Sequence, residues 1–170
     1  MPDRDDLPPL QFTSPAERAA AARMLEAKFH SDIPLTATID VHVREYAGDL
    51  IRLVAPLAPN RNVHGTGFAG SIYSLAALCG WGLIFLRLRE AGVAGNLVMT
   101  QAQVRYARPV AGELVATCDV RAHPGFDAAL TKYQRVGHAR IDLPVIVGDV
   151  DAPAAELTTH YVVRRPDAAP

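Results

Sequence analysis

The chain has 170 residues, 49% of them hydrophobic, and is therefore long enough to bury a core within one domain. Its formal net charge of −1 leaves no basic surplus, which argues against nucleic acid as a partner. The two cysteines, Cys79 and Cys118, lie in apolar stretches, where free thiols are expected rather than a structural disulfide.

The start of the chain, MPDRDDLPPLQF, is acidic and contains prolines. It lacks the basic start and the apolar core of a secretory signal, so we expect a cytoplasmic protein. We expect residues 1–13 to be irregular, residues 14–165 to form a single domain and residues 166–170 to be a flexible tail.

The first helix is predicted to begin at Ser14, in the sequence SPAE. This order places a hydroxyl at the N-cap, a proline at the first helical position and the Glu17 carboxylate at the third, which is a capping box. Apolar residues at helical spacing continue to about His30, and Pro34 then forbids the continuation of this helix.

Alternation of apolar and polar residues predicts a mostly antiparallel sheet in the rest of the chain. Pro144 indicates an exposed or bulged strand, and residues 126–135 are ambiguous, with a short helix as one interpretation. The expected strands are residues 38–46 and 50–56, which form a hairpin, followed by residues 97–106, 114–121, 139–147 and 157–163.

Residues 68–86, FAGSIYSLAALCGWGLIFL, contain no charged side chain. A run of this length could span a bilayer, but glycines and serines dilute its hydrophobicity and no second span exists, so we expect no membrane. A helix that is apolar all round and outside lipid must be wrapped by protein. The prediction is an α+β hot-dog fold, a curved antiparallel sheet around one long central helix, with an additional N-terminal helix.

A polar loop, PNRNVHGTG, precedes this run and holds the candidate catalytic residues Asn60, Asn62, His64 and Thr66. Amides and hydroxyls can direct hydrogen bonds at a carbonyl or a water, and Gly65 lets a ligand approach the backbone.

The first turn of the predicted helix presents backbone N–H groups near Phe68, Ala69, Gly70 and Ser71 that have no partner within the helix. Such an end stabilises negative charge and can serve as an oxyanion hole for an acyl carbonyl. The alternative is a capped helix whose loop only satisfies its own backbone.

The stretch PNRNVHGTGFAGSIYSLAALCGW resembles the signature of the hot-dog thioesterases, and in detail the YiiD-type C-terminal thioesterase domain. The matching features are an Asn-containing loop, Gly-Thr, a Phe-Gly-Gly-Ser-like turn and a following Trp81. Arg105, Tyr106 and Pro109 resemble the next strand of that family and its exit. The resemblance implies an acyl thioester on coenzyme A or acyl carrier protein, no separate cofactor, and a homodimer or dimer of dimers with sites at the subunit interface.

The sequence departs from the pattern of many hot-dog hydrolases at two places. Phe68-Ala69-Gly70 stands where many have His-Gly-Gly, and Ala77 stands where those enzymes place an acid that serves as base or nucleophile. Three hypotheses therefore stay open: thioester hydrolysis, non-hydrolytic binding of an acyl thioester, and dehydration or hydration of the acyl chain with His64 as acid and base.

For hydrolysis, Asn62 is expected to orient water or the carbonyl, with Asn60 as the second choice, and His64 is the one nearby group able to act as a base near neutral pH. A lone histidine in a loop is more often exposed or structural. Ser71 and Ser74 share a helix face that could meet the acyl group.

Arg105 and Arg108, on either side of Tyr106, are candidates for contact with coenzyme A phosphates or an acidic carrier protein. The remaining histidines show no ligand spacing, so no metal site is predicted.

Overall fold

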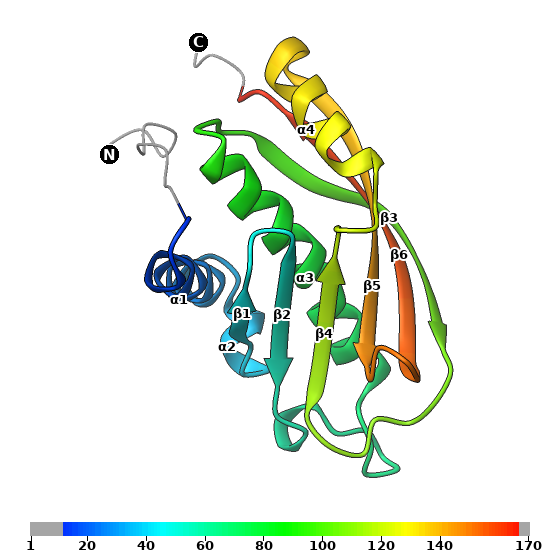
Figure 1. Ribbon diagram of the computed structural model, residues 1–170. Coiled ribbons are helices and arrows are strands. Elements are labelled where there is room, and N and C mark those ends of the chain that lie inside the picture. Colours follow the sequence, from blue (N-terminus) through cyan, green and yellow to red (C-terminus); the bar gives the residue numbers. More distant parts are fainter. Residues whose placement is uncertain (1–11, 167–170) are drawn as a thin grey trace.

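The computed structural model describes residues 12–166, and in them one curved sheet lies against one long helix (Figure 1). The expectations for residues 1–11 and 167–170 lie outside this range. All strand pairs are antiparallel, in the order β1-β2-β4-β5-β6-β3. The elements are α1 (Pro15–Asp32), α2 (Pro34–Thr38), β1 (His42–Tyr46), β2 (Leu50–Ala55), a 3-10 turn (Ala58–Asn60), α3 (Ala69–Glu90), β3 (Asn96–Tyr106), β4 (Leu114–Asp119), α4 (Gly125–Val136), β5 (His138–Gly148) and β6 (Pro153–Arg164). The predicted α+β hot-dog architecture is confirmed.

Helix α1 begins with the predicted capping box. The Ser14 hydroxyl accepts the Glu17 amide at 3.2 Å, and the Glu17 carboxylate accepts the Ser14 amide at 2.8 Å. The helix packs along β1, and its Leu25 and Phe29 are fully buried.

The prediction of one strand over residues 38–46 is wrong in its first part. Pro34 starts a second short helix, α2, instead of releasing the chain into a strand, because proline suits the first helical position. Thr36 is buried and its hydroxyl donates to the Ile33 carbonyl at 2.8 Å. Asp40 then takes a left-handed conformation, with φ of 57°, and the strand begins only at His42.

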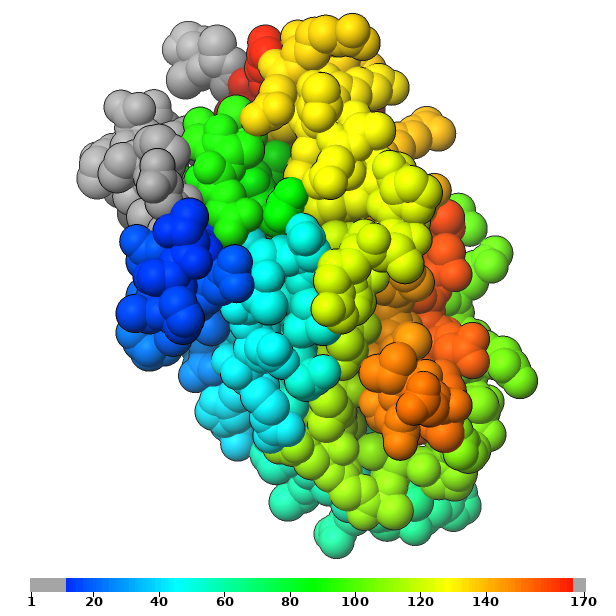
Figure 2. Space-filling view, viewed as in Figure 1, coloured from blue at the N-terminus to red at the C-terminus, as the bar shows by residue number. Residues whose placement is uncertain are grey.

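Helix α3 is long and apolar enough to cross a membrane by length and composition, and in the protein it lies against the sheet with twelve buried residues. Glycines allow the close approach. A Cβ at Gly80 would lie 2.5 Å from the Tyr161 hydroxyl, and one at Gly82 would lie 2.9 Å from the Leu25 side chain. Figure 2 shows the outer face of the sheet, which covers most of α3.

The later strands follow the predicted alternation, and the ambiguous segment 126–135 forms α4. Pro144 is accommodated because β5 pairs with β4 only near its end, at Val147 and Ile146, so that β5 has a strand neighbour on one side at Pro144. Strand β3 forms an open edge of the sheet, and none of its eleven residues is buried.

Candidate active site at the N-terminus of helix α3

The loop before α3 is organised by the Asn62 side chain. Its Nδ2 donates to the Thr66 hydroxyl at 3.0 Å and to the Gly67 carbonyl at 3.1 Å. Its Oδ1 accepts the backbone N–H groups of His64 at 2.8 Å and Thr66 at 3.1 Å. The amide that was expected to orient water therefore has its donors and its acceptor engaged within the loop, and it holds the turn in one shape.

Two glycines give this loop its path. Gly65 has a φ of 79°, a left-handed conformation that residues with a side chain adopt at a cost. Gly67 donates its N–H to the Val110 carbonyl at 2.8 Å, and a Cβ there would lie 3.1 Å from Val110 and 3.3 Å from Ile72. The chain therefore enters α3 tightly packed against the segment that follows β3.

Asn60 lies beneath the loop and is 1% exposed. Its side-chain Nδ2 donates to the backbone carbonyls of Ile39 and Pro56, both at 2.8 Å. The backbone carbonyl of Asn60 accepts the Phe68 N–H at 2.7 Å. Its Oδ1 is buried and has no hydrogen-bond partner within residues 12–166. Asn60 thus anchors the residue that precedes α3, and it does not face solvent.

The N-terminus of α3 is uncapped. Phe68 occupies the N-cap position with no side-chain hydrogen bond, and the first backbone bond of the helix is from the Ile72 N–H to the Phe68 carbonyl at 3.0 Å. The N–H groups of Ala69, Gly70 and Ser71 have no acceptor within residues 12–166. These three donors lie at the positive end of a 22-residue helix, where a developing negative charge is stabilised.

Aromatic side chains surround this helix end. The Phe68 ring lies across Gly70, where a Cβ would overlap the ring. From the end of β3, the Tyr106 hydroxyl donates to the Ala69 carbonyl at 3.0 Å. Burial raises the pKa of the Tyr106 hydroxyl, and the nearby Tyr73 raises it further. Ala69 is exposed and Ser71 is only 7% exposed. The row of free N–H groups therefore begins at the surface and ends at a buried residue.

The other candidates lie around this end in different ways. His64 is exposed on the turn. Ser74 and Ala77 are half-buried on α3, and the Ala77 carbonyl accepts the Tyr161 hydroxyl of β6 at 2.8 Å. Residues 68–89 contain no carboxylate, so the described site has free N–H donors but no acid on its helix before Glu90, the last residue of α3.

Arg105 and Arg108 do not join Tyr106 at the helix end. Neighbouring residues of a strand point to opposite faces, and Arg105 lies on the outer face, where it pairs with Glu156 of β6 at 3.3 Å. The Arg108 guanidinium donates to the Pro153 carbonyl at 3.2 Å. Glu156 was missed because a single sequence does not reveal which residues are paired across strands. Among residues 12–166, no group of three His, Cys, Asp or Glu side chains is arranged to hold a metal ion.

A curved antiparallel sheet around one helix, with free amides at the helix start, defines the class of the protein as a hot-dog domain of the thioesterase type. Residues 22–165 match the family described as "Putative thioesterase (yiiD_Cterm)", and the chain belongs to this family. The resemblance inferred from the sequence is thereby confirmed, and the family supports a general thioesterase role.

Solved structures agree with this assignment. A protein of unknown function from Chlorobaculum tepidum has 26% identity and a TM-score of 0.82, over 93% of this chain and 99% of that one. A putative thioesterase from Shewanella oneidensis has 30% identity and a TM-score of 0.78, over 87% and 99%. A probable thioesterase from Pseudomonas aeruginosa shares the fold at 22% identity and a TM-score of 0.70, over 84% and 94%.

Proposed function

We propose that the protein hydrolyses an acyl thioester carried by coenzyme A or by an acyl carrier protein. The observation that supports this most is the uncapped start of α3, where the N–H groups of Ala69, Gly70 and Ser71 have no acceptor within residues 12–166. A thioester carbonyl oxygen bound there would be polarised, and the negative charge that forms on it would be stabilised.

In the proposed reaction, water attacks the carbonyl carbon, a C–O bond forms and the C–S bond breaks. The thiolate leaves and accepts the proton that the water has lost, through a base. A thiol with a pKa of about 8.5 leaves without strong acid assistance. Asn62 contributes by holding the loop, and His64 or a group from a second subunit serves as the base, because residues 68–89 hold no carboxylate.

We propose a homodimer formed through β3. The other edge strand, β1, is packed against α1, whereas β3 has an open ladder over eleven residues, with Val98 55% exposed. A long open edge readily pairs with another strand. Pairing with a second copy would bring the partner's side chains towards the helix start beside Tyr106.

The experiment is a panel of acyl-coenzyme A and acyl-carrier-protein thioesters with a thiol-detecting dye, using a matched pair of variants. Gly70→Pro removes one oxyanion N–H, and proline is tolerated in a first helical turn. Gly70→Ala adds the carbon that displaces the Phe68 ring but keeps the N–H. We expect Gly70→Pro to lower kcat about 100-fold or more below Gly70→Ala. Equal rates in the two variants would refute the oxyanion role.

The second candidate function is binding of an acyl thioester without hydrolysis. The absence of an acid at Ala77 and the engagement of Asn62 within its own loop favour it. Saturable binding with no thiol release from any thioester would support this function. A changed acyl chain on an intact thioester would instead indicate hydratase or dehydratase chemistry.

A further inference from the structure

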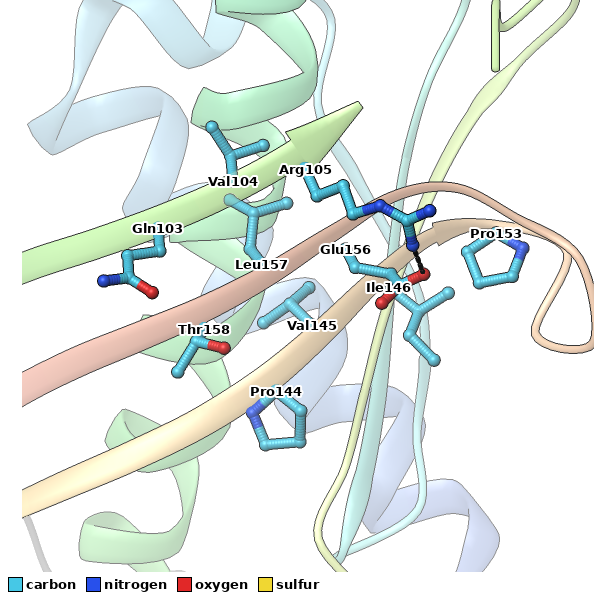
Figure 3. A pocket seen from close by; sticks show the side chains of 10 residues that line it. All are labelled: Gln103, Val104, Arg105, Pro144, Val145, Ile146, Pro153, Glu156, Leu157 and Thr158. Carbon is cyan, nitrogen blue, oxygen red and sulfur yellow. Dashed lines mark hydrogen bonds and ion pairs between the residues drawn. The ribbon is translucent and has the colours of Figure 1, made fainter. Parts of the chain in front are cut away.

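A pocket with a volume of about 560 Å³ lies on the outer face of the sheet, across β3, β6 and β5 (Figure 3). This volume is within the range of small-molecule sites. Pro144, Ile146 and Pro153 provide apolar surface, and the amide of Gln103 and the hydroxyl of Thr158 stand beside it. None of these five residues belongs to the candidate active site.

The pocket and the start of α3 are at the same end of β3 but on opposite faces of the sheet. Tyr106 bonds to Ala69 at the helix start, and its neighbour Arg105 lines the pocket. The β3 ladder ends at this point, because the next two residues, Ala107 and Arg108, both donate their N–H groups to the same carbonyl, that of Ala154. Layers packed on a sheet are separated by about 10 Å, a distance that an extended pantetheine arm can exceed.

The charges at the rim suit an anion at the end of the pocket nearest the active site. Arg105 is 74% exposed at its side chain and is paired with Glu156, and Arg108 lies beside Pro153. Arg105 and Arg108 place two guanidinium groups at this end of the pocket, beside the Glu156 carboxylate. Guanidinium groups bind phosphate oxygens in a forked geometry, and a side-chain amide such as Gln103 can both donate to and accept from a purine ring.

We propose that this pocket receives the phosphorylated adenosine end of coenzyme A while the thioester lies at the start of α3. The proposal rests on the proposed thioesterase function and deepens it, since it selects coenzyme A over a carrier protein. Arg105 exchanges part of its pairing with Glu156 for a phosphate group, and the apolar surface of Pro144 and Ile146 supports the base.

Substituting the two partners of the Arg105–Glu156 ion pair one at a time is expected to change the Kd for coenzyme A in opposite directions. Arg105→Ala removes a phosphate ligand, and we expect the Kd for coenzyme A to rise roughly tenfold. Glu156→Gln frees the Arg105 guanidinium and removes a negative charge, so the Kd is expected to fall. Arg140→Ala, on the same face of β5 but four residues from Pro144, is the control and leaves the Kd unchanged. A structural ion pair alone would make Arg105→Ala and Glu156→Gln change the Kd in the same direction or not at all, which would overturn the proposal.

Isothermal titration with coenzyme A measures binding and needs no turnover, so a failure of hydrolysis does not hide the result. Dephospho-coenzyme A tests the 3′-phosphate, and a holo-acyl carrier protein tests the competing carrier. Binding of the carrier protein without binding of coenzyme A would refute the proposal. Thr158→Glu places a carboxylate in the pocket from an exposed position and leaves the ion pair intact. This variant should also raise the Kd for coenzyme A. Thermal denaturation of each variant verifies folding.

Kinetics provide a second readout. Acyl-N-acetylcysteamine carries the thioester without the nucleotide. Arg105→Ala is expected to lower the ratio of kcat/KM for acyl-coenzyme A to kcat/KM for the truncated thioester roughly tenfold. An unchanged ratio would refute the assignment of the pocket, even if Gly70→Pro confirmed the oxyanion role.

Discussion

The close approach of α3 to β6 can be tested by adding one methyl group at Gly80. A Cβ there would lie 2.5 Å from the Tyr161 hydroxyl and 3.1 Å from two carbons of its ring. Tyr161 is 1% exposed and its hydroxyl donates to the Ala77 carbonyl, so the ring has little room to retreat. The residue that allows helix and sheet to approach is therefore the one with no side chain.

Two opposing effects determine how much Gly80→Ala changes the free energy of unfolding. Alanine is favoured over glycine in a helix by about 1 kcal/mol, and overpacking a core costs typically about 1–3 kcal/mol. Because the Tyr161 ring is held in place, we expect the upper part of that range and a net loss of about 1–2 kcal/mol. For a chain of this size the loss lowers Tm by roughly 2–8 °C.

Thermal and urea denaturation followed by circular dichroism measure this change. Gly112→Ala is the matched control, since a Cβ there meets nothing within 4 Å, and it should be neutral or slightly stabilising. Tyr161→Phe removes the closest atom, so Gly80→Ala should cost less in that background than in the wild type. A Gly80→Ala protein as stable as the Gly112→Ala protein would refute this account of the packing.

Four further predictions concern the loop, the first helix, the thiols and the open edge. We expect Asn62→Ala to abolish most thioesterase activity and to lower Tm, because the backbone N–H groups of His64 and Thr66 lose the Asn62 Oδ1 as their acceptor. Full activity would exclude the positioning role. Hydrogen bonds from Ser14 and Thr13 hold the pKa of Glu17 below its ordinary value of 4.5. The stability they provide is therefore present above pH 4.5 and is lost as the pH falls through the lower folded pKa, and an acid titration of Tm should show this loss reduced in Glu17→Gln. Burial raises the pKa of Cys79 to about 12, so its thiol should react with a thiol dye only after urea unfolding. Val98→Asp places like charges near each other in a β3-paired dimer and should shift the mass in light scattering from dimer to monomer; a monomeric wild type would contradict the pairing.

Local rules accounted for much of the fold. The capping box at Ser14 and the alternation in β5 and β6 depend on neighbouring residues, and both could be read from the sequence. The strand expected from Thr38 failed, because one residue, Pro34, both ends a helix and begins another. Proline limits the backbone without deciding which of these two effects dominates.

The candidate site was harder to predict, because contacts across the fold decide the role of each side chain. The sequence placed Asn62 beside the helix start, but a single polar residue does not reveal whether its amide bonds to its own loop or to a ligand. Free N–H groups at the start of α3 are a local expectation, since every helix begins with donors that have no partner within the helix. The absence of a cap could be inferred only weakly from Phe68, which has no polar side-chain atom.

The end of β3 connects the two proposed sites through the alternation of a single strand. Tyr106 faces inwards and bonds to Ala69, and Arg105 faces outwards to Glu156. A one-residue shift in the pairing of β3 with β6 would exchange these faces, placing the guanidinium at the helix start and the phenol on the outer surface. The register that pairs Arg105 with Glu156 therefore positions both the helix end and the pocket, so the same strand would hold the two ends of one long thioester in a fixed relation.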